Sequence, residues 1–61
     1  MFKIGNKQYK TFSQAVLAAY KMGMKEVEIS EELFKQVDQD TQSLAMVALE
    51  VERTIRQQAM Y

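Results

Sequence analysis

Few side chains in this sequence have the chemistry that catalysis needs. The chain contains neither histidine nor cysteine, so the commonest general acid–base group and the thiol nucleophile are both missing. The remaining nucleophile candidates are serines that fall where helices are expected to begin: Ser13, Ser30 and Ser43. Serine is favoured at helix N-termini, where its hydroxyl accepts a backbone hydrogen bond. Helix capping therefore explains these serines, and the sequence predicts no catalytic residue.

Carboxylates offer two further candidates, an acid–base pair and a metal site. Glu26 and Glu28 lie two residues apart, on one face of a predicted strand, where we expect them to be solvated or ion-paired. Residues 38–42 begin like a calcium-binding loop. However, Ser43 stands where such a loop needs glycine, and Leu49 stands where it needs a bidentate glutamate. We therefore expect no metal, no cofactor and no enzymatic activity.

The charged residues are segregated along the chain, although the net charge is zero. Residues 1–25 contain five lysines and no acid, whereas residues 26–52 contain eight acids and Lys35 as the only base. Such segregation suits a basic face for a polyanion or an acidic face for a basic partner. It also fits two halves that lie side by side and neutralise each other, which is the arrangement we expect.

Nucleic-acid binding is the alternative function that the basic half raises. Its phosphate contacts would come from three lysines of a predicted hairpin: Lys3, Lys7 and Lys10. The sequence offers no arginine cluster and no second exposed aromatic residue on which bases would stack. Nucleic acid is therefore a less favoured partner than another protein.

Residues 14–33 loosely resemble a helix-turn-helix. Ala19, Gly23 and Ile29 occupy the small, turn and apolar positions expected in that motif. The helix that would contact DNA carries four glutamates, which phosphates repel. Val27 and Ile29 also alternate with acids, which is typical of a strand. We therefore interpret the second part of this segment as a strand.

A β-hairpin is predicted at the N-terminus. Phe2 and Ile4 alternate with a lysine, and Gly5-Asn6 suits a two-residue turn because both residues tolerate positive φ. This turn places Phe2 opposite Tyr9. The hairpin then has one apolar face and one lysine-bearing face.

A helix and a third strand are expected to follow the hairpin. Thr11 and Gln14 fit a capping box for a helix over residues 12–22, which Gly23 ends. The helix is apolar nearly all round, so it should be covered on more than one side. Residues 25–29 alternate as a strand. A right-handed crossover places this strand antiparallel beside the first, in a three-stranded antiparallel sheet of order 2-1-3 with its glutamates beside the hairpin lysines.

The sequence of the second half predicts a short helix over residues 31–37, capped by Ser30, and a long helix over residues 42–58. One continuous bent helix is the alternative. The long helix carries a core-facing stripe: Leu44, Val47, Ala48, Val51, Ile55 and Ala59. It also carries a second apolar patch bordered by arginines, and it is longer than five-residue strands can cover. The predicted interface comprises Leu17, Tyr20, Ala45, Met46, Leu49, Arg53, Arg56 and Met60.

Residues 1–61 are expected to form a single small α+β domain that dimerises through residues 42–61. A domain of this size buries only about 60% of its unfolded surface, and this one lacks the residues for a disulfide or a usual zinc site. The longest apolar run has six residues and no signal peptide is evident, so a cytoplasmic protein without a membrane partner is expected. We predict a homodimeric inhibitor or modulator of another, unidentified protein, of the size common among phage and mobile-element regulators.

Overall fold

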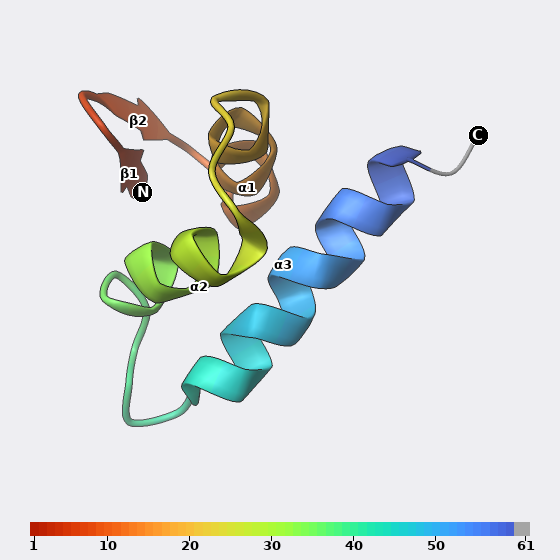
Figure 1. Ribbon diagram of the computed structural model, residues 1–61. Coiled ribbons are helices and arrows are strands. Elements are labelled where there is room, and N and C mark those ends of the chain that lie inside the picture. The colour runs from red at the N-terminus through yellow and green to blue at the C-terminus, as the bar shows by residue number, and fades with distance from the viewer. Residues whose placement is uncertain (60–61) are drawn as a thin grey trace.

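The computed structural model describes residues 1–59 as a β-hairpin followed by three helices (Figure 1). In Figure 1, α2 crosses α1 at a steep angle, and α3 runs diagonally past both helices on the side away from the hairpin. No described helix is long and apolar enough to cross a membrane. The elements are β1 (Phe2–Ile4), β2 (Lys7–Tyr9), α1 (Phe12–Lys21), α2 (Glu26–Phe34) and α3 (Leu44–Ala59).

The hairpin confirms the predicted register. β1 and β2 pair antiparallel with Phe2 opposite Tyr9, and Gly5 has the positive φ of 60° that a tight two-residue turn requires. Ile4 is buried, and both aromatic side chains are half-buried against the core. The apolar face of the hairpin therefore covers the helices, and its lysine-bearing face points outward.

The third strand predicted over residues 25–29 is wrong, and so is the sheet order 2-1-3. The described sheet has two strands, and residues 26–29 begin α2 instead. The free edge of β1 is occupied by the side chain of Gln36. Its Oε1 accepts the Lys3 N–H at 2.6 Å, and its Nε2 donates to the Lys3 carbonyl at 2.8 Å. One amide thus pairs the two backbone groups that a third strand would have paired.

A tight turn joins α1 to α2. Thr11 caps the start of α1, as predicted, and Gly23 follows its end with φ 93°. The Gly23 N–H donates to the Tyr20 carbonyl at 3.1 Å, and the Met24 N–H donates to the Ala19 carbonyl at 3.2 Å. This pair of bonds is a Schellman motif, which satisfies carbonyls at the helix end and needs a left-handed residue.

Helix α1, the turn at Gly23 and helix α2 together form a helix-turn-helix arrangement, which the residue types at positions 19, 23 and 29 indicate. Ala19 and Ile29 are fully buried, and Gly23 makes the turn between their helices. The strand interpretation fails because Ile29 pairs at helical spacing with Leu33, which is also fully buried. Glutamate is a good helix former, so the acidic segment accepts this conformation readily.

The second half of the chain contains two separate helices rather than one. Because α2 already begins at Glu26, Ser30 lies inside it and does not cap a helix over residues 31–37. The Ser30 hydroxyl donates to the Glu26 carbonyl at 2.7 Å. Ser43 does cap the long helix, since its hydroxyl accepts the Met46 N–H at 3.2 Å.

The core lies where the three helices meet, with β1 adding one side chain. Within the predicted core-facing stripe, Val47, Val51 and Ile55 are buried and Ala48 is half-buried, whereas Leu44 is exposed and the side chain of Ala59 lies outside the described part of the chain. Phe2, Tyr9, Phe12 and Met24 are among the half-buried residues around the core. The fully or nearly fully buried apolar residues are Ile4, Ala15, Val16, Ala19, Ile29, Leu33, Val47, Val51 and Ile55.

Candidate protein-interaction surfaces

Helix α3 has apolar side chains on two opposite sides. Val47, Val51 and Ile55 recur every four residues and are buried against α1 and α2. Met46 and Leu49 point away from this stripe and are 52% and 48% exposed. An amphipathic surface helix ordinarily buries one stripe and solvates the rest. The second apolar side of α3 is therefore not explained by the packing of this chain alone.

A groove of about 490 Å³ runs beside this second side, between the start of α1 and α3; we call it the α1–α3 groove. The rings of Phe2 and Phe12 line it and meet edge to face, with centroids 5.6 Å apart. Glu50 is the one charged side chain among its lining residues. The complete lining is Phe2, Phe12, Ser13, Val37, Gln42, Met46, Leu49 and Glu50.

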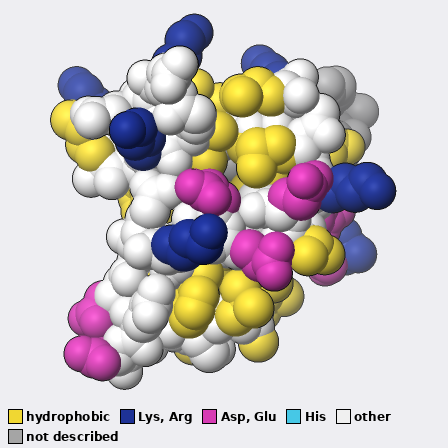
Figure 2. Space-filling model, turned by 60° about the vertical axis from the view of Figure 1, so that its left-hand side comes forward, with side chains coloured by type: hydrophobic (Ala, Val, Ile, Leu, Met, Phe, Trp, Pro, Cys, Tyr) yellow, Lys and Arg dark blue, Asp and Glu magenta, His cyan; other side chains and the backbone are white. Residues whose placement is uncertain are grey.

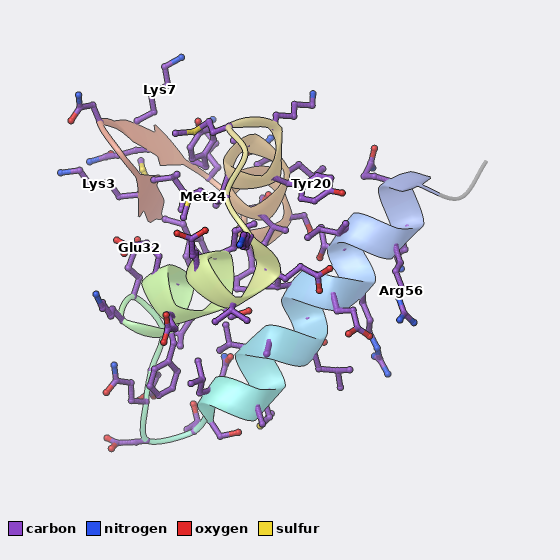
Figure 3. All side chains as sticks on the ribbon, viewed as in Figure 1. Lys3, Lys7, Tyr20, Met24, Glu32 and Arg56 are labelled. Atoms are coloured by element: carbon purple, nitrogen blue, oxygen red, sulfur yellow. The ribbon has the colours of Figure 1, made fainter. Side chains whose placement is uncertain are left out.

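The structure places several predicted interface residues around this groove. Met46 and Leu49 line it together. Leu17 is half-buried and Tyr20 is 52% exposed, and both share a side of α1 with Ser13, which also lines the groove. Figure 3 shows Tyr20 extending from α1 toward the C-terminal half of α3. These side chains form one candidate surface, whose contact with another chain remains a prediction.

The other predicted interface residues lie on the polar border of this surface. Ala45, Arg53 and Arg56 are exposed. Arg56 projects outward from α3 in Figure 3, and its Nη2 lies 3.4 Å from the Glu52 carboxylate. Met60 lies outside the described residues. The last described side chains of α3 are the exposed, polar Gln57 and Gln58.

A second groove, of about 330 Å³, lies between α2 and α3; we call it the α2–α3 groove. Sequence reasoning missed it because it assigned Val27 to the covered face of a strand, whereas Val27 is 69% exposed. The groove has no lysine or arginine among its lining residues, and Ser30 completes its lining. The other lining residues are three apolar side chains and three carboxylates: Val27, Leu44 and Ala48, with Glu26, Glu31 and Glu52.

Charge and apolar surface lie close together on this molecule. On the face shown in Figure 2, acidic side chains lie beside exposed apolar ones, and basic side chains project at the upper edge. Lys3 and Lys7 extend away from the hairpin in Figure 3, and Lys10 is exposed. Lys3 lines a shallow hollow together with Glu32 of α2, so the basic and acidic halves adjoin here. The salt bridges among residues 1–59 nevertheless lie within the second half, so mutual neutralisation of the two halves stays a prediction.

The described residues contain no group of three or more histidine, cysteine, aspartate or glutamate side chains that could hold a metal ion. Two of the three candidate nucleophiles have structural roles, since Ser43 caps α3 and Ser30 bonds within α2. Ser13 does not cap α1, because Thr11 does, and it lines the α1–α3 groove. Comparison with protein-family models, curated proteins and solved structures finds no match for this chain. Its own surfaces are therefore the basis for inferring function.

Proposed function

We propose that this chain is a small, non-enzymatic protein-interaction module that forms a homodimer through the outer side of α3 and, as a dimer, inhibits or modulates another protein. The observation that carries this proposal is the exposure of Met46 and Leu49 beside a groove lined by Phe2 and Phe12. Methionine and aromatic side chains are enriched in the cores of protein interfaces. The near absence of charge in the α1–α3 groove makes this surface suitable for burial.

Two-fold symmetry supports self-association in particular. In a two-fold dimer the same patch on both subunits must be self-complementary. Here the protruding side chains, Met46 and Leu49, and the recess lined by Phe2 and Phe12 belong to one continuous surface. Each subunit can therefore insert its apolar side chains into the recess of the other. A 61-residue domain also has little core of its own, so burying a second apolar surface adds substantially to its stability.

Substituting Leu49→Glu tests this proposal, because it places a charge at the centre of the proposed interface and leaves the core untouched. Hot-spot residues, which cluster at the centre of an interface, cost about 2 kcal/mol or more when truncated, so a Leu49 that acts as one should raise the dimer dissociation constant by at least about 30-fold when replaced. Sedimentation velocity at micromolar concentration would measure it, with circular dichroism as a check on folding.

The matched control is Val27→Glu, which makes the same kind of change at an exposed apolar residue of the other groove. It should leave the dimer intact. A wild-type chain that sediments as a monomer throughout the micromolar range would contradict the homodimer. Equal dimerisation by Leu49→Glu and the wild type would instead show that the contact lies elsewhere.

The second candidate is a nucleic-acid-binding regulator. Exposed lysines on the hairpin, together with the helix-turn-helix arrangement that follows it, favour this function. The glutamates of α2 weigh against it, because phosphates repel them where a recognition helix should enter the major groove. Glu32 also lies beside Lys3, the first of the candidate phosphate contacts. Protein binding therefore accounts for more of the surface than nucleic-acid binding does.

A further inference from the structure

The α2–α3 groove has an exposed apolar lining that the fold does not use. Val27 is 69% exposed in the first turn of α2, although the same helix already buries Ile29 and Leu33 completely. On the opposite wall, Leu44 is 42% exposed although it begins a helix with its own buried stripe. Neither side chain stabilises the core, and both line the same groove.

The apolar lining continues along α2 beyond this groove. A neighbouring hollow is lined by Glu31, Phe34, Lys35 and Leu44, and it shares Glu31 and Leu44 with the α2–α3 groove. The combined strip thus runs from Val27 to Phe34. Seven helical steps correspond to about 10 Å, or two turns, which is the length over which one amphipathic helix presents side chains at i, i+3, i+4 and i+7.

The charge around the groove is acidic. Glu26, Glu31 and Glu52 line it, and within the described residues only Glu52 has an ion-pair partner, Arg56 at 3.4 Å. Lys35 stands at the far end of the strip, where it lies 3.9 Å from the Glu32 carboxylate. An occupant of this groove must therefore bring positive charge to at least two unpaired carboxylates.

We propose that the α2–α3 groove binds a basic amphipathic helix of another protein. Its apolar side chains would pack on Val27, Leu44 and Phe34, while its lysines or arginines would face Glu26 and Glu31. Charge complementarity of this kind steers association and rejects acidic competitors. Helix-in-groove binding supplies the apolar contact.

A second copy of this chain does not fit the same groove. In a two-fold dimer the glutamates of one copy would face those of the other, which is repulsive. The hairpin lysines of a second copy lie on a polar face, which offers no apolar side chains to cover Val27 and Leu44. The occupant is therefore a different protein. This inference does not depend on homodimerisation, because it concerns the opposite flank of α3.

A titration with a designed peptide tests the proposal. The probe is a synthetic helix of about 18 residues with leucines at i, i+3, i+4 and i+7 and lysines elsewhere. Added to ¹⁵N-labelled protein, it should shift the amide signals around Val27, Leu44 and Ala48, with an affinity that falls as salt rises. The comparison peptide has glutamate at every lysine position and should not bind. Repeating the titration in Leu49→Glu separates this site from self-association.

Charge-reversal variants locate the site. Glu31→Lys combined with Glu52→Lys should weaken binding of the lysine peptide about tenfold, since attraction at two positions becomes repulsion. Asp40→Lys is the control, because it makes one such charge reversal, half the total of the double variant, in the loop outside both grooves. Val27→Ser removes an apolar contact at an exposed position that the fold tolerates, and it should also weaken binding.

Four results of the peptide titrations would overturn the proposal. These are equal binding of the glutamate peptide, shifts confined to the hairpin or the α1–α3 groove, unchanged affinity in both groove variants, and a weakening by Asp40→Lys as large as that by the double variant. If the same amide signals shifted when the protein alone was concentrated, a second copy would be the occupant, and the proposal would again be wrong.

Discussion

Helix α3 separates two grooves that are both apolar but differ in charge. The α1–α3 groove is lined by two phenylalanines and one carboxylate, whereas the α2–α3 groove is lined by three carboxylates and no phenylalanine. Both expose enough apolar surface to bind something, so apolar area alone does not say what each binds. The charge separates the two proposals: the nearly uncharged first groove suits a copy of this chain, and the acidic second groove suits a basic partner.

One helix can serve both grooves because its own fold uses so few of its positions. Val47, Val51 and Ile55 hold α3 in place, which leaves both flanks of the helix free. Leu44 and Met46 lie two residues apart and line different grooves. In this short chain, a single helix thus supplies three buried core residues and also one wall of each candidate binding surface.

The largest effect is expected in the buried stripe of α3, because this stripe holds in place the helix that forms one wall of each groove. Val51→Glu places a charge in a fully buried position between α1, α2 and α3, which costs several kcal/mol and exceeds what a marginal domain can lose. We expect this variant to be unfolded at 25 °C by circular dichroism. Leu49→Glu, two residues away on the outer side, should keep its helical signal. A cooperative thermal transition near the wild-type temperature in Val51→Glu would show that α3 is not held by this stripe.

An intermediate effect is expected at Gly23. This residue positions α2, which forms a wall of the α2–α3 groove only. Gly23→Ala forces a side chain into φ 93°, although no other atom would contact the new methyl group within 4 Å. The cost is therefore a backbone cost of about 1–2 kcal/mol, or a melting temperature lower by roughly 8–16 °C for a domain of this size.

The amide signals that shift in Gly23→Ala show which of the two grooves the substitution affects. Because Gly23 directs α2 away from α1, the shifts in Gly23→Ala should concentrate on α2 and spare Met46 and Leu49. Gln14→Ala, at an exposed position inside α1, is the control and should leave the melting temperature nearly unchanged. Shifts of equal size in both grooves would mean that the two surfaces are not independent.

The turn at Gly23 also marks where sequence reasoning stopped being sufficient. Before it, the hairpin register, the cap at Thr11 and the first helix are correct, because each depends on residues close together in the chain. After it, the i, i+2 spacing of Val27 and Ile29 favours a strand over five residues, although the segment forms a helix that buries Ile29 and exposes Val27. The choice depends on Leu33, one helical turn beyond Ile29, and on what the rest of the chain packs against it.

The edge of β1 shows the same dependence on distant residues. The third strand was predicted from the alternation of residues 25–29, yet the outward-facing N–H and C=O of Lys3 are both paired by Gln36, 33 residues away. No local pattern indicates that contact. The exposed pair Met46 and Leu49 was predictable, since helical spacing separates them from the core stripe. The α2–α3 groove was not predictable, because it exists only once residues 26–34 form a helix.

The smallest effect is expected at Arg56, and it tests which of the two grooves this residue influences. Its guanidinium pairs with Glu52 of the α2–α3 groove, and such an exposed i, i+4 pair contributes about 0.3–0.5 kcal/mol to stability. Arg56→Ala should therefore change the melting temperature by only a few degrees. Freeing the Glu52 carboxylate makes that groove more acidic, so the lysine peptide should bind about twofold more tightly, while the dimer dissociation constant stays constant. Arg53→Ala removes the same charge without releasing a groove carboxylate, and it should not tighten peptide binding. If Arg56→Ala weakened the dimer instead, Arg56 would belong to the outer side of α3, as its place in the predicted interface implies, and its pairing with Glu52 would be incidental to both surfaces.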